Sequence, residues 1–258
     1  MSEGLISQQQ IDRVKEIAKE KGIDVEHLTP AEQFEKDNIE QFNRALRIKK
    51  GRKYFSMSVW PGNIPLKFEF SKWKPDLQPN VEKAKQLGNQ AYKAAKSIVN
   101  QPNNYVLAGI RGTGKTSLAL AIMYQAKREG LGVMFVSTDE LSSLIGKQYN
   151  LSDIKKRLSD IERAMKETDL LILDDFGTEG GMKGAIKPVR TDMQEFMYRV
   201  ANARVDFENN KAKRSTIITT NNSRQQLESM YNEKLISRLM TSNPERQLAF
   251  DLKDVRGI

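Results

Sequence analysis

Glycine, lysine and threonine residues between positions 109 and 116 have the spacing of a phosphate-binding loop. The stretch GIRGTGKT has glycines at its first, fourth and sixth positions, followed by Lys115 and Thr116. Glycines let backbone N–H groups turn inward around an anion, and the start of a following helix adds its dipole. The lysine then reaches the β- and γ-phosphates, and the threonine hydroxyl ligates Mg²⁺. The pattern predicts a nucleoside triphosphate site; the alternative is a glycine-rich turn that binds nothing.

The flanking residues supply the strand and helix that such a loop requires. Residues 105–108 are apolar and predict a short buried strand, while the residues from Thr116 onward predict a helix with one apolar side. The residues expected to hold ATP are Gly109, Ile110, Arg111, Gly112, Thr113, Gly114, Lys115, Thr116 and Ser117.

Two adjacent carboxylates follow the apolar run DLLIL. Asp174 and Asp175 end this predicted strand, and ligands of parallel α/β sheets bind at the carboxyl ends of the strands. Asp174 is expected to hold Mg²⁺ together with Thr116, and Asp175 to act as a base or to position water. Because aspartate is shorter than the glutamate that hydrolysing proteins of this class usually carry, we expect slow hydrolysis that depends on assembly. Alternatively, the two acids cap a turn.

Three polar residues farther along the chain are candidates for sensing the γ-phosphate. Asn221 ends the apolar run STIITT and is placed to bind the attacking water or the γ-phosphate; alternatively, it caps the next turn. Arg238, on a predicted helix, is a candidate for an arginine finger acting in trans on a neighbouring subunit's nucleotide, unless it is merely solvated. Arg256 is a second phosphate-sensing candidate.

Composition and charge narrow the class of protein. The 258 residues are 38% hydrophobic, enough for a core, and contain no apolar run of about 18 residues that would span a membrane. The absence of cysteine excludes disulfides and thiolate zinc sites, and the single histidine, His27, cannot build a metal site alone. With 42 Lys and Arg against 33 Asp and Glu, the net charge of +9 favours polyanionic partners such as nucleic acid.

The order of predicted elements indicates an α/β fold. Apolar or β-branched runs near 105, 133, 170, 215 and 247 alternate with helical segments, which is typical of a parallel sheet covered on both faces. We therefore predict a five-stranded P-loop domain over residues 75–258. A small helical domain at 1–55, whose second helix is expected to stop at Gly51, and a proline-rich linker at 56–74 precede it.

Together, these motifs resemble the AAA+ helicase loaders of the DnaC/DnaI type and their transposition relatives of the IstB type, over residues 60–258. The resemblance rests on GIRGTGKTS, LLILDDFG, TIITTN and ISRLM in this order, and on Arg204 at a recurrent arginine. It implies an AAA+ (ASCE) P-loop NTPase without a lid domain, which uses ATP and Mg²⁺. Since DnaI-type loaders carry a zinc-bound N-domain and this chain has no cysteine, a zinc-free helical N-domain is expected.

The resemblance also implies partners and a location. Such proteins bind a hexameric replicative helicase through the N-terminal domain, self-associate through the ATPase domain and place the helicase on single-stranded DNA in the bacterial cytoplasm, or that of the host if phage-encoded. Tyr149, Lys183, Lys187 and Arg190 are the DNA-contact candidates, because aromatic rings stack on bases and cations follow phosphates. A packed tyrosine and a solvated loop are the alternatives. An ATPase that assists a transposase, or an adaptor that binds ATP without hydrolysing it, also remain open.

Overall fold

The computed structural model describes the backbone of residues 13, 16, 17, 19–21, 31–148, 152–181 and 186–255. The chain divides into two compact units, Met1–Leu46 and Arg47–Ile258. The sequence predicts that the second helix begins with Thr29 as its N-cap and Pro30 at its first position, and both residues lie outside the described ones. No helix in the described ranges is long and apolar enough to cross a membrane.

The second unit is built on one parallel sheet of five strands. Its order is β2-β3-β6-β1-β7, and every neighbouring pair is parallel. The strands are β1 (Tyr105–Gly109), β2 (Val133–Ser137), β3 (Leu170–Asp174), β6 (Ser215–Thr220) and β7 (Gln247–Phe250). The predicted five-stranded parallel sheet is therefore confirmed. A short antiparallel pair, β4 (Val205–Asp206) with β5 (Lys211–Ala212), was not predicted.

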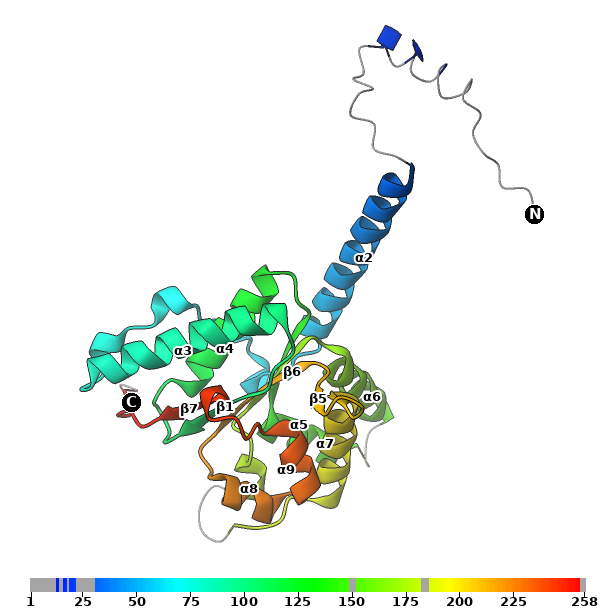
Figure 1. Cartoon of the computed structure of the whole chain (residues 1–258). Coiled ribbons are helices and arrows are strands. Elements are labelled where there is room, and N and C mark those ends of the chain that lie inside the picture. The colour runs from blue at the N-terminus through cyan, green and yellow to red at the C-terminus, as the bar shows by residue number, and fades with distance from the viewer. Residues whose placement is uncertain are drawn as a thin grey trace. The chain divides into compact units, whose positions relative to one another are not determined.

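Helices cover both faces of the sheet, as Figure 1 shows. They are α3 (Val81–Asn100), α4 (Lys115–Arg128), α5 (Thr138–Lys147), α6 (Ser152–Glu167), α7 (Thr191–Ala203), α8 (Arg224–Met230) and α9 (Glu233–Leu239). A further helix, α2 (Ala31–Ser56), precedes them in the chain. Single 3₁₀ turns are η1 (Pro61–Asn63), η2 (Phe70–Lys72), η3 (Pro75–Leu77), η4 (Thr178–Gly180) and η5 (Pro244–Arg246).

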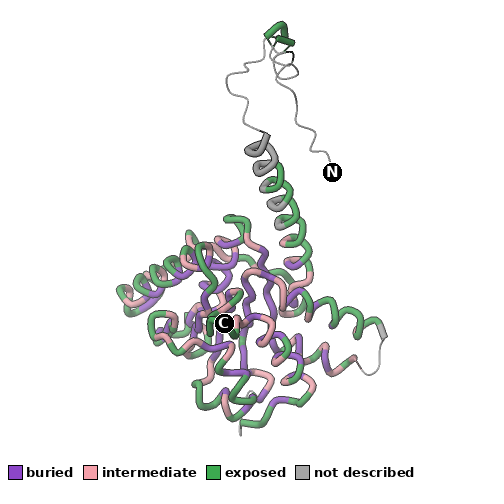
Figure 2. The backbone as a smooth tube through the Cα atoms, turned by 45° about the vertical axis from the view of Figure 1, so that its right-hand side comes forward, coloured by how far each residue is buried: buried purple, intermediate pink, exposed green. Residues whose placement is uncertain are grey.

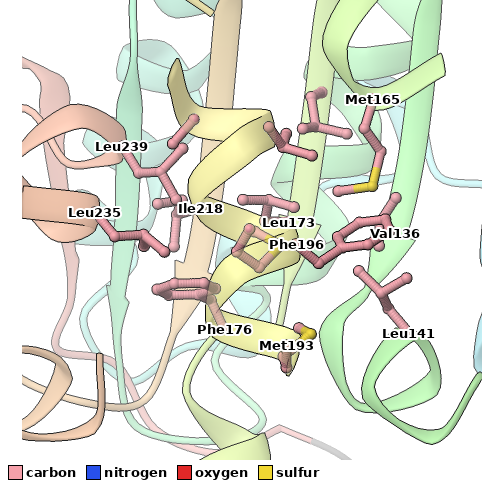
Figure 3. Close-up of a cluster of buried hydrophobic side chains, with 14 of the residues drawn as sticks. Val136, Leu141, Met165, Leu173, Phe176, Met193, Phe196, Ile218, Leu235 and Leu239 are labelled. Carbon is pink, nitrogen blue, oxygen red and sulfur yellow. The ribbon is translucent and has the colours of Figure 1, made fainter. Parts of the chain in front are cut away.

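Alternating side chains of the strands form two separate cores. Leu173 and Ile218 pack with residues of α5 to α9, as the close-up in Figure 3 shows, whereas Ile172 and Ile217 pack with α3 and α4. The strands carry apolar side chains on both faces because both faces are covered. In Figure 2 the buried residues accordingly concentrate along the strands.

The predicted end of the second helix at Gly51 is wrong, since α2 continues to Ser56. Tyr54 in its last turn is buried, and its hydroxyl donates a hydrogen bond to Glu167 Oε2 at 2.8 Å. A Cβ atom at Gly51 would lie 3.3 Å from the Cα atom of Gly132. This glycine therefore permits close packing against the core and does not terminate the helix.

The segment before the phosphate-binding loop is irregular but packed on the sheet. Val59 bridges Val136 of β2, and the Trp60 ring stacks on Phe135 with 4.5 Å between ring centroids. The predicted linker at 56–74 thus contributes side chains to the core. The assignment of separate functions to residues 1–55, 56–74 and 75–258 stays a prediction.

Candidate functional site: the phosphate-binding loop

The loop between β1 and α4 has the backbone conformation that its glycines allow. Gly112 and Gly114 have φ angles of 75° and 93°, in the region that side chains disfavour, and Gly114 is the N-cap of α4. A Cβ atom at Gly114 would lie 2.6 Å from Cζ3 of Trp73. The loop therefore requires glycine at this position both for its conformation and for the close approach of an indole ring.

Lys115 is the first residue of α4, directly after the loop, and contacts Asn221, the residue after β6. Its Nζ donates hydrogen bonds to the carbonyl oxygens of Gly109 and Ile110, at 2.8 Å and 2.7 Å, and to Oδ1 of Asn221 at 2.8 Å. Two residues that are 106 positions apart in the chain thus meet at the carboxyl edge of the sheet. The structure brings Lys115 and Asn221 together, as their predicted roles require.

Asp174 forms a second polar pair beside the loop. The residue is 4% exposed, and its Oδ1 accepts hydrogen bonds from the hydroxyls of Thr116, at 2.9 Å, and Thr219, at 2.6 Å. Burial, and then the neighbouring Asp175, raise the pKa of Asp174 from 3.8 to about 6. A cation bound beside this carboxylate would favour its charged form and so oppose that shift.

The oxygen atoms at this edge fit Mg²⁺. Mg²⁺ is usually bound by one or two carboxylates together with substrate phosphates, and does not need a cage made wholly of protein ligands. The Asp174 carboxylate and the Thr116 hydroxyl supply such ligands 2.9 Å apart. Within the described ranges no group of three or more His, Cys, Asp or Glu side chains gathers as a metal site, so a zinc-like site is not seen there.

Asp175 lines the cavity above the loop and has an unusual backbone conformation. Its φ angle is 54°, in the left-handed region that non-glycine residues rarely adopt. Its N–H donates to Oγ1 of Thr219 at 2.9 Å, which ties it to β6. The side chain is exposed, as a group that is to meet a substrate or water must be.

A cavity of about 440 Å³ opens over these residues. Its lining includes Lys115 and Thr116, together with Asp175 and Asn221. Residues that were not among the predicted site residues complete the lining, and they include Phe68, Lys72, Trp73, Leu77, Gln78 and Val255.

Trp73 is one residue that sequence reasoning missed. Its indole lies against Gly114 on the loop and against Gly88 in the middle of α3, where a Cβ atom would be 2.9 Å from Cδ1. Its Nε1 donates to the carbonyl oxygen of Ala84 at 3.0 Å. A glycine within a helix costs about 1 kcal/mol relative to alanine, so Gly88 was a signal of close packing that could have been noticed.

Gln78 is a second missed residue. It is 4% exposed, its Nε2 donates to the carbonyl oxygen of Lys253 at 2.8 Å, and its Oε1 accepts from the Lys253 N–H at 2.9 Å. The Val255 N–H donates to the carbonyl oxygen of Gly112 at 3.2 Å. Gln78 therefore fixes the C-terminal segment against the phosphate-binding loop.

Arg238 does not line this cavity. Its guanidinium lies over the rings of Tyr198 and Phe207, 4.7 Å and 5.4 Å from their centroids, and its Nη1 is buried without a hydrogen-bond partner. It lines a separate hollow of about 790 Å³, together with Asn104 and Phe207. Its predicted action on a neighbouring subunit's nucleotide stays a prediction, while an action within its own chain is not supported.

Arg204, at the arginine position that recurs in the family that the motifs resemble, is buried and forms hydrogen bonds within the core. Its guanidinium donates to the carbonyl oxygens of Met165 and Thr168, at 2.7 Å and 2.9 Å, and also to that of Ser215. Burial lowers its pKa to about 9. These contacts join the end of α6 to the start of β6.

Three of the remaining candidates, Tyr149, Lys183 and Arg256, lie outside the described residues. Lys187 and Arg190 do not line the cavity; Lys187 is exposed, and Arg190 forms an ion pair with Asp192. The phosphate-sensing role of Arg256 and the DNA-contact role of the other four residues stay predictions.

Two known proteins resemble this chain over most of its length. Protein YdaV of Escherichia coli (strain K12), which is described as uncharacterized, is 25% identical over 222 residues, covering 85% of this chain and 79% of YdaV. The crystal structure of DnaI matches with a TM-score of 0.51 at 18% identity, over 75% of this chain and 95% of that chain.

A crystal structure of a DNA replication initiation factor matches with a TM-score of 0.50 at 21% identity, over 67% of this chain. This chain spans only 48% of that factor's length, and at such identities both structural matches show the shared fold alone.

The sequence pattern of the family described as IstB-like ATP binding protein matches residues 66–242, which include the loop, both aspartates, Asn221 and Arg238. This stretch is more than half of the chain, and it confirms the resemblance found in the motifs. The chain belongs to the IstB-like ATP-binding protein family.

Proposed function

We propose that this protein is an ATPase that binds a hexameric replicative helicase and helps to place it on single-stranded DNA. The observation that carries the ATPase part is the convergence of two pairs at one sheet edge. These pairs are Lys115 with Asn221, and Thr116 with Asp174.

Each residue of these pairs has a distinct role in the proposed reaction. Lys115 binds the β- and γ-phosphates, Thr116 and Asp174 hold Mg²⁺, and Asn221 orients the water or the γ-phosphate. Asp175 accepts a proton from the attacking water or positions it. Bound Mg²⁺ supplies neutralisation of the charge that develops on the phosphate oxygens.

In this proposal, self-association brings an arginine of a neighbouring subunit to the ATP site. Phosphoryl transfer is commonly accelerated by an arginine that a neighbouring subunit supplies. Arg238 lines a hollow that is separate from the cavity over the phosphate-binding loop of the same chain. Its Nη1 atom is buried and has no hydrogen-bond partner. Slow turnover by the monomer and faster turnover by the assembly follow from this separation.

The helicase and DNA parts of the proposal rest on the family resemblance and the net charge of +9. The fold shared with DnaI supports them as a likeness of architecture. Residues 1–55 are the proposed helicase-binding domain, and Tyr149, Lys183, Lys187 and Arg190 are the proposed DNA contacts.

Co-purification with candidate hexameric helicases, with and without ATP, tests the proposal. Lys115→Ala should remove ATP uptake in calorimetry and any ATP dependence of helicase capture, because it removes the charge that binds the triphosphate. Lys93→Ala, which removes an exposed lysine from α3, is the matched control. Failure of the folded wild-type protein to take up adenine nucleotide would end the ATPase proposal.

The second candidate is an ATPase that assists a transposase in choosing target DNA, and the IstB-like family favours it. The same ATP chemistry serves both functions, so the partner distinguishes them. Capture of a transposase and not of a helicase by the full chain would select this candidate.

A third candidate is an adaptor in which ATP fixes the shape and hydrolysis is dispensable. Asp175→Asn should abolish turnover and retain ATP binding. If helicase placement on single-stranded DNA survives in this variant, the adaptor function is favoured over a hydrolytic cycle.

A further inference from the structure

A half-buried acid, Glu179, lies on the turn that follows Asp175 and has no part in the function proposed above. It follows Asp175 by four positions, on η4. Its Oε2 accepts hydrogen bonds from Oγ1 of Thr138 and the N–H of Gly177, both at 3.0 Å, and its Oε1 accepts one from the Tyr231 hydroxyl. Burial raises its pKa from 4.5 to about 7. Burying an acid costs free energy, so these contacts call for an explanation.

The backbone of the turn after β3 needs support from its surroundings. Asp175 holds a left-handed φ of 54°, a conformation that persists in a non-glycine residue only where neighbouring contacts impose it. Its N–H is fixed by Thr219, and its carbonyl oxygen accepts a hydrogen bond from the Thr178 N–H at 3.1 Å and lies 3.2 Å from Oγ1 of Thr138.

Glu179 contacts two of the groups that shape this turn. Thr138, which begins α5, is fully buried, and its hydroxyl lies 3.2 Å from the carbonyl oxygens of both Asp174 and Asp175 while also contacting Glu179. Gly177, with a φ of 97°, donates its N–H to the same carboxylate oxygen. The position of the Glu179 carboxylate therefore determines where these two groups can lie.

Tyr231 connects the carboxylate to the segment between α8 and α9. Its ring stacks on Phe176, the residue after Asp175, with centroids 4.7 Å apart and planes 6° from parallel. It directly precedes Asn232, the N-cap of α9, and α9 carries Arg238. A displacement of α9 therefore moves the Tyr231 hydroxyl and the carboxylate that it contacts.

We propose, resting on the hydrolytic function proposed above, that Glu179 is a positioning residue that holds Asp175 in its catalytic conformation through Thr138 and Gly177. Tyr231 links this turn to the segment that carries Arg238. When Arg238 contacts a neighbouring subunit, the resulting displacement of α9 then changes the position of the Asp175 carboxylate.

Tyr231→Phe tests the proposal with the smallest change, because it removes one hydroxyl and leaves the ring stacked. Misplacement of a catalytic group by about 1 Å can reduce a rate 10²-fold, so we expect kcat for ATP hydrolysis to fall about tenfold or more. The Kd for ATP should stay within about twofold, since the loop and Lys115 are untouched.

Tyr54→Phe is the matched control. It removes a tyrosine hydroxyl that likewise donates to a glutamate, at 2.8 Å to Glu167. Glu167 ends α6 just before β3 begins, whereas the phosphate-binding loop lies at the carboxyl ends of the strands. It should leave kcat unchanged. Glu179→Ala should exceed Tyr231→Phe in effect, and Glu179→Gln, which retains an acceptor for Tyr231, should recover part of the rate.

Amide hydrogen exchange of residues 175–180 gives a readout that is independent of turnover. Exchange should be faster in Tyr231→Phe and Glu179→Ala than in the wild type and in Tyr54→Phe. Unchanged exchange would overturn the positioning role. So would parallel losses of ATP affinity and thermal stability in Tyr231→Phe, which are the signs of a purely structural contact.

The two proposals fail in different ways. Wild-type protein without ATP turnover, or full turnover in Asp175→Asn, would end the hydrolytic function while exchange still decides whether Glu179 holds the turn. The link to α9 is decided by a double-mutant cycle on assembly-stimulated kcat. If the effects of Tyr231→Phe and Arg238→Ala on the free energy of activation are additive, Tyr231 does not couple the turn to Arg238.

Discussion

The cavity over the phosphate-binding loop and the hollow around Arg238 differ in how fully their polar groups are paired. In the cavity, Lys115 and Asp174 each have several hydrogen-bond partners within the chain. In the hollow, Arg238 Nη1 is buried with no partner, and Phe207 beside it is 61% exposed. Buried donors without partners are rare in folded proteins. The first site is therefore held together within one chain, whereas the unpaired nitrogen of Arg238 is what our proposal assigns to a group from a neighbouring subunit.

Arg238→Ala should show the largest effect on this comparison. If the hollow meets a neighbouring subunit's nucleotide, assembly-stimulated kcat should fall on the order of 10³-fold, the range found for arginine fingers. The Kd of the monomer for ATP should not change, because Arg238 does not line its own cavity. Turnover measured against protein concentration checks this.

Arg246→Ala is the control for that change, since Arg246 lines the same hollow. It should reduce turnover far less. If monomeric Arg238→Ala binds ATP more weakly than the wild type, the hollow around Arg238 does not act independently of the cavity over the phosphate-binding loop.

Asp174→Asn should show, through the pH dependence of the free energy of unfolding, how much stability the buried charge of Asp174 costs. The pKa of Asp174 is raised to about 6, so between pH 4 and 6 the folded protein holds a proton that the unfolded chain has released. The free energy of unfolding of the wild type therefore falls as pH rises through this window, and stays lowered above it. Asparagine still accepts from Thr116 and Thr219 but carries no charge.

Urea unfolding without nucleotide or Mg²⁺ should therefore find the variant more stable than the wild type by about 3 kcal/mol at pH 7.5, and nearly equal to it at pH 4. Asp160→Asn, at an exposed position of α6, should show no such trend. A variant that is less stable than the wild type at pH 7.5 would show that Lys115 and the hydroxyls already stabilise the carboxylate.

Gln78→Ala should give the smallest effect, because it alters the wall of the cavity and none of the groups proposed to contact the phosphates. Two hydrogen bonds to Lys253 are lost, each worth about 1 kcal/mol, and part of this loss should appear as an affinity for ATP that is lower by about threefold to tenfold. Calorimetry with Gln247→Ala, on the exposed side of β7, as the control checks it. Equal affinities of Gln78→Ala and Gln247→Ala for ATP would show that the contact between Gln78 and the C-terminal segment does not affect nucleotide binding.

Local patterns made much of the fold and the loop predictable. The residues of GIRGTGKT are contiguous, and Asp174, Asp175 and Asn221 each end an apolar strand, so parallel topology alone places them at one edge. Gln78 and Lys253 meet across 175 positions, and no local pattern announces such a pair. Gly51 misled because a glycine that permits close packing and one that ends a helix look alike in sequence.

The position of Trp73 provides a built-in optical probe. Its indole touches Gly114 in the loop, so a change in the loop alters the polarity around a fluorescent ring. The other tryptophan, Trp60, is stacked on Phe135 inside the core and should contribute a steady background. Emission from the unlabelled chain can therefore report occupancy of the loop during titration, without any dye.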